Sequence, residues 1–287
     1  MIKKITKWSL LAVAALIIAA GVYGGIEFRR VYYGTHVYET VPPRLPAKLS
    51  PPAILVFSKT NGFREDAAVR AANTALGAIA AKRGWSAFFT ENGAVFNPAD
   101  LSRFQATVWN NTSGDVLTPD QKQAFRSYIE NGGGFVGIHG AGGDPRYEWR
   151  WYVDTLLGAE FKGHPLHPQF QRAVIHIEDP NDVTMAGLPT EWSRVDEWYS
   201  FEKSPRGGGI KVLATLDERT YSPKMFWKDI SMGADHPIIW KHCVGNGRVF
   251  YSALGHSAST YQEPLHLKEL ESGIAWVARV TDDACPK

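Results

Sequence analysis

Continuous apolar runs alternate with amphipathic stretches between residues 53 and 139. The runs AILVFSK (53–59), WSAFFTEN (85–92) and FQATVWNN (104–111) are apolar enough to form buried strands. Residues 64–84 carry acidic residues first and Lys-Arg-Gly last, which predicts a helix, and Thr118 with Gln121 predicts a capping box for a helix to Asn131. Strands alternating with helices at this spacing predict an α/β fold with a flavodoxin-like, doubly wound, mostly parallel sheet.

A fourth strand is predicted within GGGFVGIHGAGG, residues 132–143. Phe135, Val136 and Ile138 suit a buried strand, and glycines mark a turn on each side of it. His139 is then the last residue of the strand. Ligands of open α/β sheets bind outside the carboxyl ends of the strands, so His139 is expected to face a site.

The pattern changes after residue 165, where strand-like runs follow one another with fewer helices between them. These runs are RAVIHIED, RVDEWYSF, IKVLATLD, HPIIWKHC and GRVFYSAL, and the helical stretch 263–280 follows them. We therefore expect one domain over residues 53–280.

The N-terminal region predicts a membrane anchor. Residues 8–26 are uncharged over nineteen positions and follow Lys3, Lys4 and Lys7. A helix of this length spans a hydrocarbon core of about 30 Å. We interpret residues 1–30 as an anchor with the lysines in the cytoplasm and the domain outside it. The alternative is a signal peptide cleaved near Ala19-Ala20-Gly21, which would give a secreted protein.

Residues 31–52 are expected to form a spacer, because five prolines within residues 39–52 favour extended backbone. The composition is 44% hydrophobic and 21% charged, as in folded proteins. The net charge of +2 and the absence of a basic stripe argue against a nucleic-acid partner. Cys243 and Cys285 are the only cysteines, and they form either one disulfide or two unpaired thiols.

Four of the nine histidines lie beside Gly or Pro at the edge of a strand-like run: His139, His164, His236 and His256. A single histidine is more often structural than catalytic, but four in this pattern favour a site. Imidazole exchanges protons near neutral pH and binds divalent metals when neutral.

The stretch VDEWYSF places two carboxylates in an aromatic strand. Adjacent strand residues point to opposite faces, so Glu197 shares a face with Tyr199, and Asp196 shares one with Trp198. An inward carboxylate needs a cation, a metal or hydrogen-bond donors. Trp198 and Tyr199 are candidates for stacking on a sugar ring, with core packing as the alternative.

Lys59, Asn61 and Arg64 follow the first strand, where they could hold hydroxyl groups or an anion. The single glycine of this turn fits neither the dinucleotide fingerprint nor a P-loop, so no nucleotide cofactor is expected.

In its motifs the chain resembles the ThuA-like family of trehalose-utilisation proteins, within the class I glutamine-amidotransferase-like superfamily. The likeness is carried over residues 53–279 by FSKTNGFRE, GGGFVGIHGA, LLGAEFKGHP, DEWYSF, HPIIWKH, GNGRVFYSALGH and GIAWVAR. The resemblance implies a carbohydrate substrate, with 3-keto-glycosides the expected class. The turn that carries a cysteine nucleophile in amidotransferases holds His139 here, so glutamine hydrolysis is not expected. Glu65 stands where many family members have histidine.

We therefore expect acid/base elimination, hydrolysis or isomerisation of a keto-sugar, with a divalent metal as a possible cofactor. His139, Glu197 and His256 are the expected catalytic residues, and His164 and His236 the expected metal ligands. The expected substrate contacts are Lys59, Asn61, Arg64, Trp198 and Tyr199. The alternative is a non-catalytic, membrane-tethered carbohydrate-binding or assembly domain.

Overall fold

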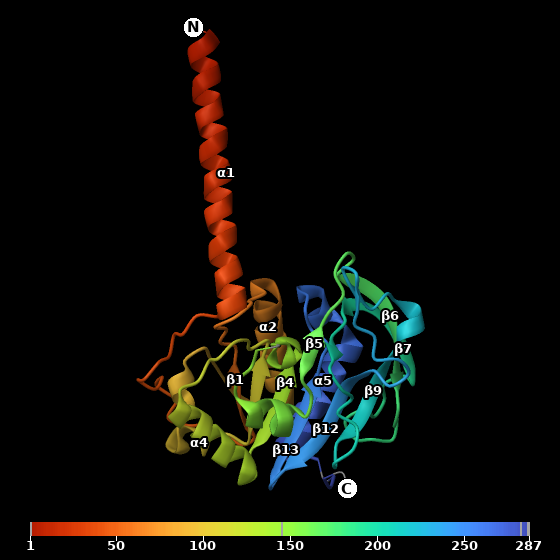
Figure 1. The fold of residues 1–287 in the computed structure, drawn as a ribbon. Helices are drawn as coiled ribbons and strands as arrows, with labels where there is room; N and C mark the ends of the chain where they lie inside the picture. Colours follow the sequence, from red (N-terminus) through yellow and green to blue (C-terminus); the bar gives the residue numbers. More distant parts are fainter. Residues whose placement is uncertain (1, 145, 282, 286–287) are drawn as a thin grey trace.

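A nine-stranded sheet forms the centre of the molecule (Figure 1). The computed structural model describes residues 2–144, 146–281 and 283–285. In spatial order the strands are β2 (Ser86–Thr90), β1 (Ala53–Phe57), β3 (Ala106–Asn110), β4 (Gly134–Ile138), β13 (Gly247–Ser252), β12 (Pro237–Val244), β9 (Lys211–Asp217), β6 (Phe170–Ile177) and β7 (Glu191–Glu197).

The first five strands, from β2 to β13, run parallel to one another and confirm the expected α/β fold with parallel strands. The remaining four add as an antiparallel extension that ends at β7. The register between β12 and β9 shifts near Pro237 and Ile239, and such irregularities bend and twist a sheet. The sheet is therefore mixed and mostly parallel.

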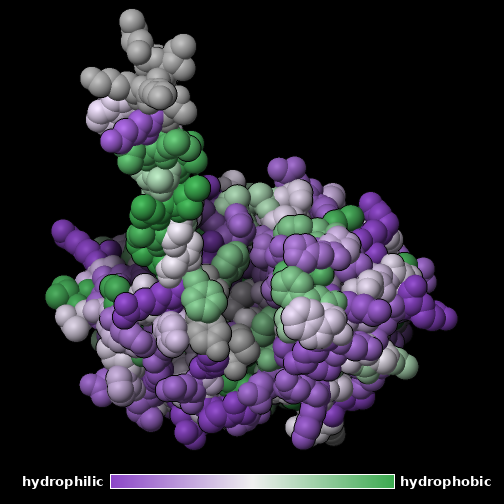
Figure 2. Space-filling model, turned by 45° about the horizontal axis from the view of Figure 1, so that its top comes forward, coloured by the Kyte–Doolittle hydropathy of each residue, from purple (hydrophilic) through white to green (hydrophobic). Residues whose placement is uncertain are grey.

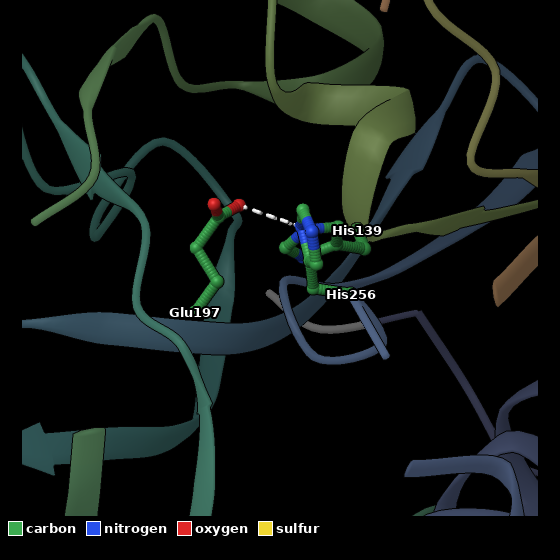
Figure 3. Close-up of side chains that lie close together, drawn as sticks. All are labelled: His139, Glu197 and His256. Atoms are coloured by element: carbon green, nitrogen blue, oxygen red, sulfur yellow. Dashed lines mark hydrogen bonds and ion pairs between the residues drawn. The ribbon is translucent and has the colours of Figure 1, made fainter. Parts of the chain in front are cut away.

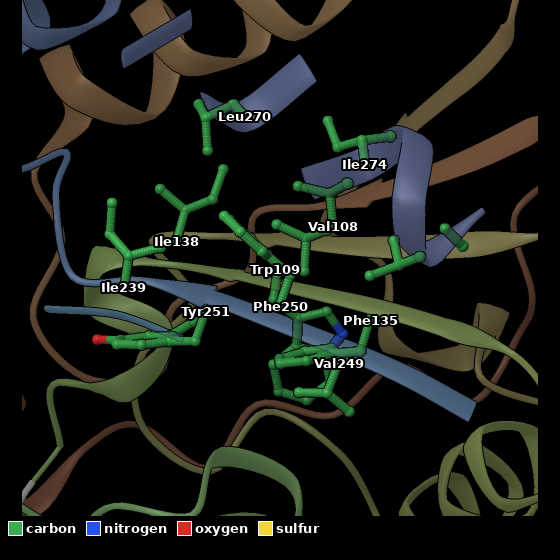
Figure 4. Close-up of a cluster of buried hydrophobic side chains, with 14 of the residues drawn as sticks. Val108, Trp109, Phe135, Ile138, Ile239, Val249, Phe250, Tyr251, Leu270 and Ile274 are labelled. Atoms are coloured by element: carbon green, nitrogen blue, oxygen red, sulfur yellow. The ribbon is translucent and has the colours of Figure 1, made fainter. Parts of the chain in front are cut away.

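Helices cover both faces of the parallel part, as a doubly wound fold requires. Trp109 of β3 and Phe135 of β4 lie on one face, where Phe125 of α4 (Pro119–Glu130) packs against both rings. On the other face, α5 (Pro264–Val277) places Leu270 and Ile274 over the sheet (Figure 4). The same side carries α2 (Asp66–Arg83), which contacts α5.

The predicted helix signals act as expected. Thr118 and Gln121 form the reciprocal capping box of α4. Gly84 ends α2 with φ of +70°, a conformation that favours glycine. Glu65 accepts a hydrogen bond from Ala67 N at the start of α2.

Several short elements were not predicted. These are a π-helix over Trp151–Leu157, a short α3 (Pro98–Leu101), and the paired strands β5 (Phe161–Gly163) with β8 (Ser200–Phe201) and β10 (Lys224–Met225) with β11 (Lys228–Asp229). Each is too short to produce a periodic hydrophobic pattern.

Helix α1 (Ile2–Tyr33) projects from the domain (Figure 1) and presents a hydrophobic surface (Figure 2). Its segment Lys7–Arg30 is long and apolar enough to cross a membrane, and none of its most apolar window is buried. The proline-rich residues after it form no helix or strand, and side-chain contacts attach them to the domain. Glu39 pairs with Lys59 at 2.5 Å, and Asn92 donates to Val41 O at 3.0 Å.

The two cysteines are joined as a disulfide, which resolves the alternative left open by the sequence. Cys243 of β12 pairs with Cys285, forty-two residues further along the chain. The bond ties the C-terminal segment to the sheet, where Asp283 also pairs with Lys241 at 2.8 Å.

Candidate functional site

Three side chains from three strand ends meet at one edge of the sheet. His139 directly follows β4, His256 lies four residues beyond β13, and Glu197 is the last residue of β7. β4 and β13 are parallel neighbours, so His139 and His256 belong at the same edge. β7 is four strands further along from β13 in the sheet order. Because Glu197 nevertheless contacts both histidines, the antiparallel extension must bend toward this edge.

The three ligand-type atoms form a tight triangle (Figure 3). Nε2 of His139 lies 3.2 Å from Oε2 of Glu197 and 3.1 Å from Nδ1 of His256. Nδ1 of His256 lies 2.9 Å from the same Glu197 oxygen. All three side chains are buried.

The orientation of His139 is fixed from several sides. Its backbone has φ of +43°, an uncommon conformation for histidine that marks the sharp turn after β4. Its Nδ1 lies 2.7 Å from the carbonyl oxygen of Ala253, which can only accept a hydrogen bond. Nδ1 therefore carries a proton, and in neutral His139 the Nε2 lone pair points into the triangle. The Tyr199 ring stacks on the imidazole at 4.1 Å, and Tyr251 donates to the His139 carbonyl.

Glu197 is held as a carboxylate. Burial alone raises its pKa, but when the His139 and His256 rings are protonated, their hydrogen bonds and positive charge outweigh burial and hold the pKa of Glu197 far below the usual value. Its other oxygen accepts from Gln169 at 2.5 Å and lies 3.2 Å from Nδ1 of His164. Burial lowers the pKa of His256, but the Glu197 hydrogen bond and charge raise it above the ordinary value overall.

Asp196, the neighbour of Glu197, has a different task. It is fully buried and accepts hydrogen bonds from the backbone N–H groups of Gly255 and His256, at 3.0 and 3.3 Å. Arg194 lies 3.2 Å from its carboxylate. Two carboxylates on opposite faces of one strand end therefore serve one site: Glu197 contacts the His256 ring, and Asp196 holds its loop. Asp196 was not among the expected site residues.

A pocket of about 620 Å³ opens above the triangle and is large enough for a small molecule. Aromatic and polar side chains line it together: Phe63, Ser113, Asp144, Arg146, Phe161, His164, Gln169, Glu197, Tyr199 and His256, with Gly62 and Gly143. Phe63, Ser113, Asp144, Arg146, Phe161 and Gln169 were not among the expected site residues. Phe63 and Phe161 lie in two of the family motifs, but an apolar side chain there gave no sign of contact with a ligand.

The two histidines expected to bind a metal lie in different places. His164 lines the pocket, about a quarter of its side chain is exposed, and its Nδ1 also lies 3.0 Å from Pro165 O. His236 is fully buried outside the pocket, where Nδ1 contacts Glu218 at 2.7 Å and Nε2 contacts the Tyr199 carbonyl at 2.8 Å. Both nitrogens of His236 are therefore engaged, and it supports Tyr199 rather than the triangle.

Only one of the five expected substrate contacts lines the pocket, and that is Tyr199. Trp198 is buried and donates its indole N–H to Gln171 O. Lys59 and Asn61 are also buried, Lys59 against Glu39 and Asn61 against the carbonyls of Val37 and Asp115.

Arg64 is likewise engaged elsewhere. It forms ion pairs with Asp66 at 2.6 Å and Glu91 at 2.7 Å. Lys59, Asn61, Arg64 and Trp198 thus have their hydrogen-bond and ion-pair partners outside the pocket, and none of the four is part of its lining.

Among the described residues, His139, Glu197 and His256 are the group whose ligand atoms all lie within 4.8 Å of one another. Two imidazoles and one carboxylate form a donor set that binds divalent transition metals and leaves coordination positions open. The arrangement can thus hold a metal or pass protons between its members.

Comparisons with known proteins agree with this architecture. The structure is similar to a ThuA-like protein from Bacteroides uniformis, with 25% identity, a TM-score of 0.68, and coverage of 83% of this chain and 95% of that one. It is similar in fold to a ThuA-like protein from Parabacteroides merdae, at 20% identity and a TM-score of 0.63, covering 83% and 94% of the two chains. A search of curated proteins gave no match.

The family model described as ThuA, trehalose utilisation, matches residues 53–277, the region that contains the sheet, the triangle and the pocket. The chain therefore belongs to the ThuA family.

Proposed function

We propose that this ThuA-family chain is a carbohydrate-modifying enzyme that removes a proton from a keto-sugar, assisted by a divalent metal at His139, Glu197 and His256. The observation that carries the proposal is the convergence of these three ligand atoms beside a pocket lined by aromatic and polar side chains, among them Glu197 and His256.

The spacing of the triangle supports a metal. Ligands about 2.1 Å from a common ion lie roughly 3.0 Å apart at right angles and roughly 3.4 Å apart in a tetrahedron. The observed separations are 2.9, 3.1 and 3.2 Å. When His139 is neutral, its Nε2 and the Glu197 oxygen are two acceptors in contact. A cation among the three atoms converts this repulsion into coordination.

The pocket lining supports a sugar. Tyr199, Phe63 and Phe161 offer ring surfaces, and Asp144 and Gln169 offer polar atoms to hydroxyl groups. Burial raises the pKa of Tyr199 well above its ordinary value, so its phenol remains a neutral hydrogen-bond donor. The membership of a trehalose-utilisation family points to the same substrate class.

The chemistry follows from the position of His164. Its Nδ1 faces Pro165 O and Glu197, which leaves Nε2 to accept a proton from the carbon next to a substrate ketone. The electron pair of that C–H bond moves to the ketone oxygen and forms an enolate. Isomerisation follows when His164 returns the proton to the former ketone carbon while the hydroxyl proton of the neighbouring carbon moves to the former ketone oxygen. Elimination follows when a β-substituent leaves with its bonding electron pair and takes up the proton from His164. A divalent ion supplies the Lewis acidity that stabilises the enolate oxygen.

We also propose that α1 remains attached and holds the domain outside the cytoplasm. Lysines precede the apolar segment, and the Cys243–Cys285 disulfide is a bond that persists in oxidising compartments. Mass spectrometry of the membrane-extracted protein tests this directly: the intact chain is expected, and a mass lacking the first twenty or so residues indicates a cleaved signal peptide.

The reaction is tested by NMR of a 3-keto-glucoside in D₂O with the full chain in detergent, with and without Mn²⁺, Co²⁺ or Zn²⁺. We expect release of the aglycone or exchange of the α-proton, lost in His164→Ala and retained in His176→Ala. His176 is the matched control because it lies on β6 in ion pairs with Glu191 and Asp217. Ligand binding without turnover under every metal supports the non-catalytic carbohydrate-binding alternative instead.

A further inference from the structure

The membrane helix is attached directly to the rim of the candidate site. α1 ends at Tyr33, and Thr35 N donates to Asn61 O at 2.5 Å while its hydroxyl lies 3.1 Å from Asn61 Oδ1. Asn61 directly precedes Gly62 and Phe63 of the pocket lining. The apolar segment ends at Arg30, so at most about 17 Å of extended chain separates it from this contact. The proline-rich segment thus begins at the site rim and does not separate the site from the helix.

The pocket itself continues toward α1. A second pocket of about 270 Å³ shares Gly62, Asp144 and Arg146 with the candidate site, and Tyr33 and Gly34 also line it. Figure 2 shows a hollow beside the base of the helix, with hydrophobic surface on both sides. The opening of the site therefore faces the end of the molecule from which α1 emerges.

An aromatic hairpin tip lies beside one of the segments that line the pocket. Phe226 and Trp227, between β10 and β11, have 54% and 93% of their surface exposed. The Phe226 ring lies 5.3 Å from that of His167, in the segment that supplies His164 to the pocket. This segment rises on the same side as α1 (Figure 1).

The sequence of the tip is unusual for a hairpin. Phe226, the first of its two residues, has φ of +57°, a conformation that hairpins normally give to glycine. Trp227 is almost fully exposed, so this turn does not bury its ring. Lys224 and Lys228 flank the pair. Exposed aromatic residues beside lysines are typical of segments that lie at a membrane–water interface, where the lysines attract anionic headgroups.

We propose that Phe63, Phe226 and Trp227, here called the aromatic rim, dock onto the surface of the bilayer that holds α1, so that the site opens toward the lipid headgroups. Phe63 is 48% exposed and lines the pocket two residues after Asn61, and the hairpin packs beside the segment that supplies His164 to the same pocket. The inference rests on the proposed function only in taking α1 as an uncleaved anchor. Substrates then reach the site along the membrane surface.

The test places a fluorophore on the rim of the full chain in vesicles of phosphatidylcholine and phosphatidylglycerol. Trp227→Cys is labelled with the environment-sensitive dye NBD, and the native cysteines are spared because they form a disulfide. Ser102→Cys is the control, because Ser102 is exposed before the amino end of β3, opposite the site. Lys228→Cys provides a second labelled position, directly beside the aromatic rim.

We expect blue-shifted emission at positions 227 and 228, and quenching by doxyl-labelled lipid several-fold stronger than at position 102. Equal emission and quenching at all three positions overturns the proposal, and so does a chain from which α1 has been cleaved. The measurement needs no turnover. If the dye at positions 227 and 228 lies in lipid but the keto-sugar does not react, only the proposed function is contradicted. If the dye lies in water and the chain turns over the keto-sugar, only the docking is contradicted.

Discussion

The carbonyl oxygen of Ala253 lies 2.7 Å from Nδ1 of His139 and so determines which nitrogen of that histidine carries the proton. Ala253 directly follows β13, and His139 directly follows the neighbouring β4. The pairing of two parallel strands thus leaves a lone pair on Nε2 beside Glu197 and His256. The register between β4 and β13 therefore also orients His139 as a metal ligand.

Crowding the turn after β4 is expected to damage the site. A Cβ atom at Gly142 would lie 2.5 Å from the Tyr251 hydroxyl, which donates to the His139 carbonyl. Gly142→Ala should therefore displace Tyr251 and lower the affinity for Co²⁺ at least about tenfold, because second-shell contacts orient metal ligands. Gly77→Ala is the control, since its nearest neighbour lies at 3.6 Å and alanine favours the helix. Unchanged Co²⁺ affinity in Gly142→Ala would contradict the role given to Tyr251.

Removing the charge of Asp196 should loosen the His256 loop. In Asp196→Asn, the ion pair with buried Arg194 is lost. An amide also offers only one oxygen to the backbone N–H groups of Gly255 and His256, which now donate to two carboxylate oxygens. We expect Co²⁺ affinity to fall about 10- to 100-fold. Glu191→Gln is the comparison, because Glu191 lies on the same strand with an exposed side chain. Titration of both variants with Co²⁺ tests this. If the two variants bind Co²⁺ equally well and only the melting temperature of Asp196→Asn is lowered, the role of Asp196 is structural.

A buried ion pair at the far end of the sheet is expected to make stability depend on pH. Burial alone raises the pKa of Asp182, but hydrogen bonds with Lys211 and Lys241 lower it to about 2. The folded-state pKa lies below the unfolded value of about 3.9, so the stabilisation, about 2 kcal/mol, is present above pH 4 and is lost as the pH falls toward 2.

Thermal unfolding of Asp182→Asn and the parent chain from pH 7 to pH 2 measures this effect. The melting temperature of the variant should be lower by roughly 5 °C at pH 7, and the gap should close between pH 4 and pH 2. Asp179→Asn, which removes a more exposed partner of Lys211, should change the melting temperature much less. A gap that is independent of pH would show that the Asp182 charge is not its cause.

The sequence predicted the parallel half of the fold because its signals are local. Residues 53–57 and 134–138 are apolar runs bounded by turn residues, and Thr118 with Gln121 caps a helix wherever that helix packs. The antiparallel extension was seen only as separate strands, because its curl depends on contacts between β7 and loops that are distant in the sequence.

The same distinction separates the site residues. His139 and His256 were expected at strand edges and Glu197 as an inward carboxylate of an aromatic strand, and the family resemblance implied that they meet. The structure brings them together. Lys59 also follows a strand, but its charge is matched by Glu39, in a segment whose prolines predict extended backbone and nothing about where it lies. His236 has the same Gly-or-Pro context as His164, yet Glu218 and the Tyr199 carbonyl occupy both its nitrogens. No local pattern reports such partners.

The central claim, a metal site beside the pocket, is tested most directly by titrating the full chain with Co²⁺ and recording visible absorption. We predict one Co²⁺ per chain with d–d bands, and affinity at least about 100-fold lower in His139→Ala and Glu197→Gln but unchanged in His176→Ala. Circular dichroism establishes that each variant is folded. A folded chain that binds no Co²⁺, or binds it equally well without His139 or Glu197, would contradict the claim and leave the triangle as a hydrogen-bonded cluster.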